Sequence, residues 1–167
     1  MWEALALGFR RPTDETVARL ASAEGAQALA AAAALLDVDR SADLAARVRR
    51  LARRDGVAAL EESFRRLFGH TARAAVPPYE TEYGEDSLFL PAQEMADLAA
   101  FYRAFSLTLS AGAHERSDHI ACQCEFLLVL ARKEAYAHER DDAAMAEAAG
   151  RGGRALAPLA RWGGRIT

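Results

Sequence analysis

The chain has 167 residues, which is enough for one domain with a buried core. Its hydrophobic residues are mostly Ala and Leu, and because Ala, Leu, Arg and Glu are strong helix formers, we expect an all-α fold. The formal net charge of −3 argues against binding to the phosphate backbone of nucleic acids and leaves room for a cationic partner. No apolar run is long enough to insert into a membrane, and two cysteines within one predicted helix fit a reducing cytoplasm.

The first half of the chain predicts short helices separated by breakers. Thr13 is expected to cap a helix that continues into the alanine run, with Gly25 as a weak point or kink. Gly69 is expected to close a later helix as a C′ residue. The predicted helices cover residues 2–9, 14–36, 41–51 and 57–68.

Residues 70–90 form one long irregular segment, in which Pro77 and Pro78 precede an acidic stretch. A loop of this length in a helical domain is usually functional or disordered, and Tyr79 and Tyr83 favour a loop pinned to the core. The carboxylates of this loop fit either a solvated surface or an attraction for a cationic partner.

The second half predicts a helix over residues 91–105 and a longer one from about 118 to 138. Ser117 or Asp118 is expected to cap the longer helix, so that Asp118 and His119 lie near its open end. A short alanine-rich helix should start at Asp141 and end at Gly150, followed by a flexible tail over residues 150–167, with a last helical turn or two over residues 154–162 as the alternative there.

Metal and nucleotide chemistry have little support. Cys122 and Cys124 are two residues apart, so on a helix they point about 200° apart and do not share an ion. The four histidines lack the spacing of a zinc site, and no P-loop, dinucleotide-binding turn or nucleophile elbow is present. We predict no catalytic residue, no metal site and no cofactor. A small hydrolase built on His119 and neighbouring carboxylates is the enzymatic alternative.

Several short motifs occur in a characteristic order. They are Gly8–Pro12, Leu67–Gly69, Pro78–Tyr83, Phe101–Phe105, Glu115–Ile120 and Glu125–Leu127. Together they resemble the TorD/DmsD family of all-helical redox-enzyme maturation chaperones, to which the NarJ group is related. The resemblance covers about residues 5–140.

This resemblance implies a non-enzymatic, single-domain helical bundle over residues 1–167. It also implies a cytoplasmic chaperone that binds the twin-arginine leader of a molybdopterin oxidoreductase subunit and assists cofactor insertion before export. Two positions depart from the family pattern, Ser117 in place of the usual proline and Gln123 in place of the usual glutamate. The usual C-terminal helices are expected to be missing, and exchange of helices in a homodimer is one way to compensate.

By resemblance, leader binding is expected at the junction before the longer helix and in the acidic loop. The candidate leader-binding residues are Asp118, His119, Tyr79, Glu80, Glu115 and Tyr83. The Asp118 carboxylate would pair with a leader arginine, and His119 would add a pH-sensitive donor or acceptor. Candidates for an apolar groove are Phe68, Tyr102, Phe105 and Phe126, although such aromatics are more commonly core residues. The residue types alone also fit a helix cap in a helical assembly or regulatory module that binds no leader.

Overall fold

The computed structural model describes residues 1–35, 46–47, 50, 54, 56–69, 76–83, 90–110 and 115–156, except for the side chains of residues 32, 33, 35, 90 and 91. Every regular element within these ranges is a helix, so the all-α prediction is confirmed. None of the described helices is long and apolar enough to cross a bilayer. The chain forms two compact units, an N-terminal unit (Met1–Pro77) and a C-terminal unit (Pro78–Thr167), and each is described by itself.

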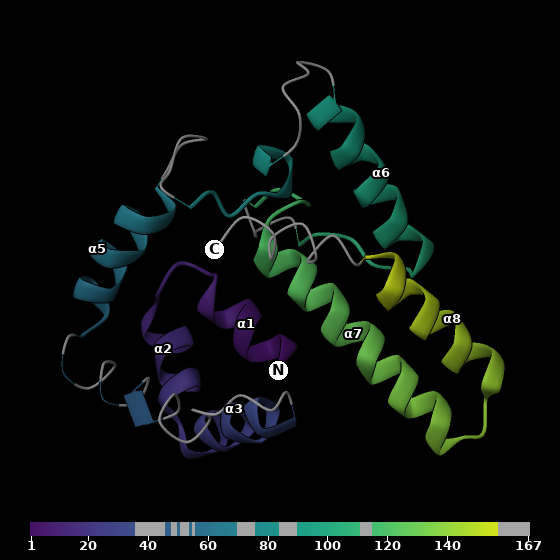
Figure 1. The fold of residues 1–167 in the computed structure, drawn as a ribbon, viewed down its shortest axis with the longest axis horizontal. Coiled ribbons are helices and arrows are strands. Elements are labelled where there is room, and N and C mark those ends of the chain that lie inside the picture. Colours follow the sequence, from purple (N-terminus) through teal and green to yellow (C-terminus); the bar gives the residue numbers. More distant parts are fainter. Residues whose placement is uncertain are drawn as a thin grey trace. The chain divides into compact units, whose positions relative to one another are not determined.

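The N-terminal unit contains short helices whose ends follow the local sequence (Figure 1). Thr13 caps the second of them through a reciprocal capping box with Thr16, as predicted. The expected break at Gly25 lies instead at Ser22, which has an extended backbone and whose Oγ accepts a hydrogen bond from the Gly25 N–H at 2.9 Å. The helices are α1 (Trp2–Gly8), α2 (Asp14–Ala21), α3 (Ala23–Leu35) and α5 (Gly56–Phe68).

The C-terminal half of α5 packs through aromatic side chains. Phe68 contacts Phe9 edge to face at a centroid distance of 5.7 Å, and Phe64 lies 4.7 Å from Phe68. Gly69 closes α5 with a φ of 63° and donates its N–H to the Arg65 carbonyl at 2.8 Å. This geometry confirms the predicted glycine stop.

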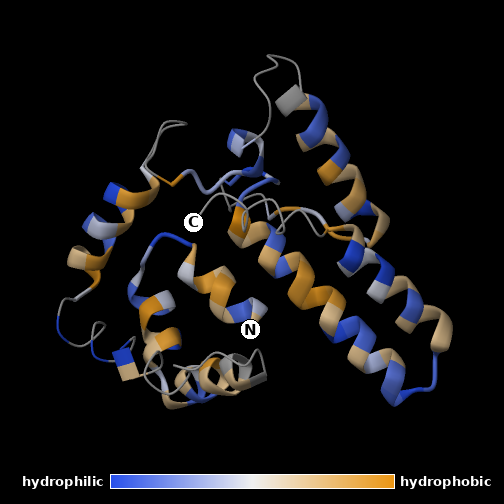
Figure 2. Ribbon diagram, viewed as in Figure 1, coloured by the Kyte–Doolittle hydropathy of each residue, from blue (hydrophilic) through white to orange (hydrophobic). Residues whose placement is uncertain are grey.

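The C-terminal unit consists of the 3-10 helix η1 (Glu80–Tyr83), α6 (Leu90–Ala104), α7 (Ile120–Glu139) and α8 (Ala143–Ala155). Helices α7 and α8 run antiparallel, joined by a tight turn in which Asp141 has a φ of 54° and Asp142 caps α8 (Figure 1). The N-terminal half of α7 is mostly hydrophobic and buried, whereas its C-terminal end is polar (Figure 2). This half of α7 is the centre of the unit's core.

An aromatic cluster holds α6 against α7. Phe126 of α7 stacks on Tyr102 at 4.6 Å and also contacts Phe101 and Phe105 at 5.5 and 5.4 Å. Tyr102 and Phe126 are each 4% exposed. The Lys133 ammonium group donates to the Phe105 carbonyl at 3.0 Å and so holds the end of α6 on the same face of α7.

The predicted flexible segment after Gly150 is partly wrong, because residues 150–155 belong to α8. Gly152 is buried in the helix, and a Cβ there would lie 2.5 Å from the Phe105 ring and 3.1 Å from the Leu130 side chain. Glycine at this position therefore permits close helix packing. The rest of the predicted tail, residues 157–167, lies outside the described residues, as do residues 41–45, 70–75 and 84–89.

Candidate functional site

The segment before η1 is attached to the start of α7 by backbone hydrogen bonds. Tyr79 and His119 form an isolated antiparallel β-bridge. The Ile120 N–H donates to the Pro78 carbonyl at 2.9 Å, and the Glu80 N–H donates to the Asp118 carbonyl at 3.0 Å. The acidic segment and the helix junction that the sequence singled out are thus brought together in one place.

His119, rather than Ser117 or Asp118, caps α7. Its Nδ1 accepts a hydrogen bond from the Ala121 N–H at 3.1 Å, so this nitrogen carries no proton. Its Nε2 faces Glu115 at 3.9 Å, and its ring packs edge to face against Tyr79. His119 thus lies at the N-terminal end of α7, as expected, but its side chain is nearly inaccessible to solvent.

The Asp118 side chain is also buried, with 1% of the residue exposed. Its Oδ2 accepts from the Thr81 N–H at 3.3 Å and from the Thr81 hydroxyl at 2.8 Å. Arg116 donates to both carboxylate oxygens, from Nε to Oδ1 at 3.0 Å and from Nη2 to Oδ2 at 2.7 Å. The bidentate arginine contact expected of this carboxylate therefore exists, but the arginine belongs to the same chain.

The Arg116 guanidinium has further partners on the acidic segment. Its Nη2 donates to the Thr81 hydroxyl at 2.6 Å, and its Nη1 lies 3.5 Å from a Glu82 carboxylate oxygen. The guanidinium carbon lies 4.4 Å from the centroid of the Tyr79 ring, in a cation–π arrangement. Residues Tyr79, Thr81, Glu82 and Asp118 form what we call the arginine cage.

Two buried polar side chains, Tyr102 and Gln123, form hydrogen bonds with residues of the η1 segment and of the turn before α7. The Tyr102 hydroxyl donates to the Ser117 carbonyl at 3.0 Å, and burial raises the pKa of Tyr102 well above its usual value. The Gln123 amide nitrogen donates to a Glu80 carboxylate oxygen at 2.6 Å. An amide suits this position, since a carboxylate there would face Glu80 with like charge.

A cavity of about 370 Å³ opens beside Asp118. Its lining includes four acidic residues, Glu80, Glu94, Asp97 and Asp118, and the apolar residues Leu98, Phe101 and Leu156, with Thr81 and Ala155 completing the wall. We call it the acidic cavity. A lining of acidic and apolar residues fits a cationic side chain with a hydrophobic stem, such as arginine.

The predicted leader-binding residues gather around this region, although their roles differ. Glu80 and Asp118 line the acidic cavity, whereas Tyr79 belongs to the arginine cage. Glu115 lies 3.9 Å from the His119 imidazole, and Tyr83 is the last residue of η1. Burial raises the pKa of Tyr79 and of Tyr83, and the Glu115 carboxylate raises that of Tyr79 further.

The four groove candidates do not form one groove. Tyr102 and Phe126 are buried core residues, and Phe105 packs on Phe126 in the same cluster, because their apolar positions are used to join α6 to α7. Phe68 belongs to the N-terminal unit, where it lines a separate apolar groove of about 260 Å³. Leu7, Val17, Leu20, Leu60, Phe64 and Leu67 provide most of its apolar surface.

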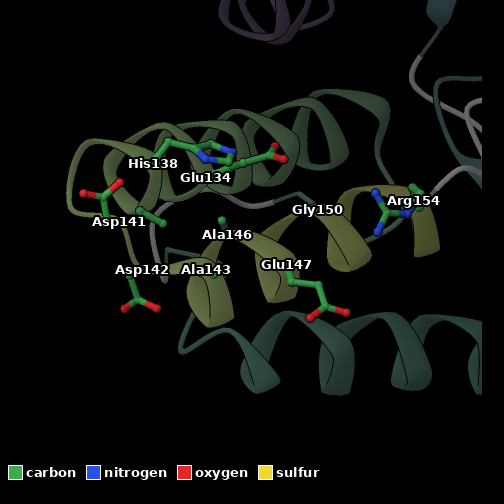
Figure 3. A pocket seen from close by; sticks show the side chains of 10 residues that line it. Glu134, His138, Asp141, Asp142, Ala143, Ala146, Glu147, Gly150 and Arg154 are labelled. Atoms are coloured by element: carbon green, nitrogen blue, oxygen red, sulfur yellow. The ribbon is translucent and has the colours of Figure 1, made fainter.

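The sequence did not identify Glu94 and Asp97 as candidate binding residues. They become part of a cavity only because the fold brings η1 and the end of α8 to the same place. The sequence also did not predict a second hollow of about 450 Å³ along α7 and α8. Figure 3 shows Glu134 and His138 side by side on α7, with Arg154 at the far end from Asp141 and Asp142. Among the described residues, no group of His, Cys, Asp and Glu side chains is placed to hold a metal ion.

One protein-family model matches most of this chain. The family model described as "Nitrate reductase delta subunit" matches residues 19–165, which is most of the sequence. Comparison with curated proteins and with solved structures finds no match. The matched family is of the NarJ type, is grouped with the TorD chaperones, and comprises molybdoenzyme maturation chaperones that bind the catalytic subunit. The closer resemblance to TorD/DmsD stays a prediction. The chain belongs to the nitrate reductase delta subunit family.

Proposed function

We propose that this chain is a cytoplasmic, non-catalytic chaperone that binds the N-terminal leader of a molybdopterin-dependent oxidoreductase subunit and assists its cofactor insertion and assembly. The family membership supports the general role. The leader is proposed as the binding segment because it combines arginines with an apolar helical stretch. Those are the chemical features that the surfaces of this chain complement.

The main support for this proposal is the acidic lining of the cavity beside Asp118. Glu94 and Asp97 stand on one face of α6, and Glu80 and Asp118 face them from η1 and the helix junction. A cationic segment entering this cavity gains electrostatic attraction that speeds encounter and weakens as salt is added. The apolar lining residues Leu98, Phe101 and Leu156 would contact the methylene stem of an arginine.

The N-terminal unit has a candidate surface of its own, the apolar groove. It is lined by hydrophobic side chains of α1, α2 and α5, and Leu67 beside it is 47% exposed. An amphipathic helix binds such a groove through apolar residues spaced three and four apart. This groove has the apolar lining that such a helix needs, whereas the aromatic cluster of the C-terminal unit is buried in its core.

Isothermal titration calorimetry with a synthetic leader peptide bearing two adjacent arginines tests the proposal. The double variant Glu94→Gln/Asp97→Asn removes two charges from the acidic cavity, and we expect it to weaken binding about 10- to 100-fold. The matched control Glu139→Gln/Glu147→Gln removes the same charge from exposed positions on α7 and α8 and should retain the parent affinity and salt dependence.

Equal affinities for the two double variants would contradict leader binding at the acidic cavity. If no leader peptide binds at all, the buried positions of Asp118 and His119 favour the alternative, a helical assembly module in which these residues only build the fold. A homodimer formed by helix exchange is part of the same proposal, and light scattering on the full chain distinguishes it from a monomer.

A further inference from the structure

Arg116 occupies a site with every feature of arginine recognition. The Asp118 carboxylate receives two parallel N–H donors at 3.0 and 2.7 Å, the fork geometry that only a guanidinium supplies. The Thr81 hydroxyl accepts a third bond at 2.6 Å, and the Tyr79 ring covers one face. A lysine ammonium lacks both the planar fork and the stacking face, so the arginine cage selects guanidinium over other cations.

The cage and its occupant differ in how firmly they are held. The Asp118 side chain is 2% exposed and is bonded independently to the Thr81 backbone and hydroxyl, so the cage keeps its shape without the guanidinium. The Arg116 side chain is 38% exposed. Since water can hydrate the departing guanidinium, its release costs far less than release of a fully buried charge.

The cage also shares a wall with the acidic cavity. Thr81 and Asp118 belong to both, so a cationic segment held in the cavity brings its side chains next to the carboxylate that Arg116 occupies. An arginine arriving there finds the same donors and acceptors that now bind Arg116. Exchange of one guanidinium for the other conserves the hydrogen bonds of the cage.

We propose that the arginine cage is a recognition site for a client arginine and that Arg116 is its placeholder, displaced when the client binds. This inference rests on the proposed leader binding. A tethered arginine competes at high effective concentration, so it lowers the apparent affinity of any single arginine. Only a segment that makes further contacts in the acidic cavity displaces it, which gives the site selectivity against isolated arginines on other proteins.

The first test uses Arg116→Ala in the full chain with arginine amide as the probe. We expect the variant to melt below the parent and to regain stability as arginine amide is added, with lysine amide at equal concentration giving no such rescue. Arg11→Ala is the matched control, because Arg11 pairs with Glu61 outside the cage, and it should show no preference for arginine amide. If Arg116→Ala does not fold unaided, its refolding yield in the two amides replaces the melting temperature. Equal responses to the two amides would overturn the placeholder.

The second test follows displacement in the parent protein. The Arg116 Nε–H, bonded to Asp118, should give a protected ¹⁵N NMR signal that shifts when the leader peptide binds, and Arg116→Ala should bind the peptide about tenfold more tightly than the parent. A peptide that binds while this signal stays unchanged would refute displacement and leave leader binding intact. Absence of peptide binding together with selective arginine rescue would refute leader binding and keep the cage as an arginine site.

Discussion

The Asp118 carboxylate joins two segments that lie 37 residues apart in the sequence. Thr81 approaches it from η1, and Arg116 approaches it from the turn before α7. Because the side chain is buried, each of these partners replaces a water molecule that the carboxylate loses on folding. At the scale of single residues, the Asp118 carboxylate therefore already has its hydrogen-bond and ion-pair partners within the chain. A partner protein could bind this carboxylate only by replacing one of them.

Replacing Asp118 with Asn tests this network. The amide keeps the shape but loses the charge and one acceptor, so we expect the free energy of unfolding to fall by about 1–3 kcal/mol. The partial exposure of Arg116 limits the loss. Urea unfolding of Asp118→Asn and of the control Asp97→Asn, which alters an exposed carboxylate of the same cavity, measures the difference. Equal midpoints for both variants would show that the network contributes nothing to stability.

The thiol of Cys124 provides a test of burial in α7. Burial raises the pKa of Cys124 from 9.0 to about 11, with a smaller contribution from the Glu125 carboxylate. The folded state thus favours the protonated thiol, and the resulting stability is present below pH 9 and lost as the pH rises through 11. At pH 8 we expect the thiolate fraction, and hence the reaction rate, to be about 100-fold below that of the unfolded chain.

A thiol-reactive chromogenic disulfide measures this rate in the native protein and in urea. Cys122→Ser isolates Cys124, and Cys124→Ser reports on the other thiol, which is also buried. Reaction of Cys124 in the native protein at the unfolded rate would mean that α7 opens at this point under native conditions.

At the scale of elements, the α7–α8 hairpin depends on one close approach. Gly152 lets α8 pack where a Cβ would collide with the Phe105 ring at 2.5 Å. The next residue, Gly153, has no described atom within 4 Å of its Cβ position, although it lies in the same helix. Alanine substitutions at the two glycines therefore separate the effect of side-chain packing on stability from the effect of helix propensity.

Gly152→Ala should destabilise the chain by about 1–3 kcal/mol through overpacking against Phe105 and Leu130. Gly153→Ala should stabilise it by about 0.5–1 kcal/mol, because alanine loses less backbone entropy in a helix. Thermal or urea unfolding of the two variants gives the comparison. A gain in stability from Gly152→Ala would mean that α8 does not pack against the aromatic cluster.

The same elements show what sequence patterns predict and what they do not. Local signals were reliable at two positions: the Thr13 cap and the Gly69 stop each depend on a few neighbouring residues. The extension of α8 through Gly152 and Gly153 was not predictable, because glycine weakens a helix locally and tertiary packing compensates. The burial of Asp118 was not predictable either, because it depends on a contact with Thr81, which is distant in the sequence.

At the scale of the whole molecule, the family match runs without interruption across both compact units, from residue 19 to residue 165. The expectation of a single domain stays a prediction. Each unit contributes a different kind of surface, an apolar groove in the N-terminal unit and the acidic cavity in the C-terminal unit.

The most direct test of this account is photo-crosslinking of a leader peptide that carries a diazirine residue next to its paired arginines, mapped by mass spectrometry on the full chain. We predict crosslinks to the walls of the acidic cavity, on η1 and on residues 94–101 of α6, and their loss in Glu94→Gln/Asp97→Asn. Crosslinks confined to the hollow along α7 and α8, or unchanged in that variant, would contradict the claim that the acidic cavity receives the client's arginines.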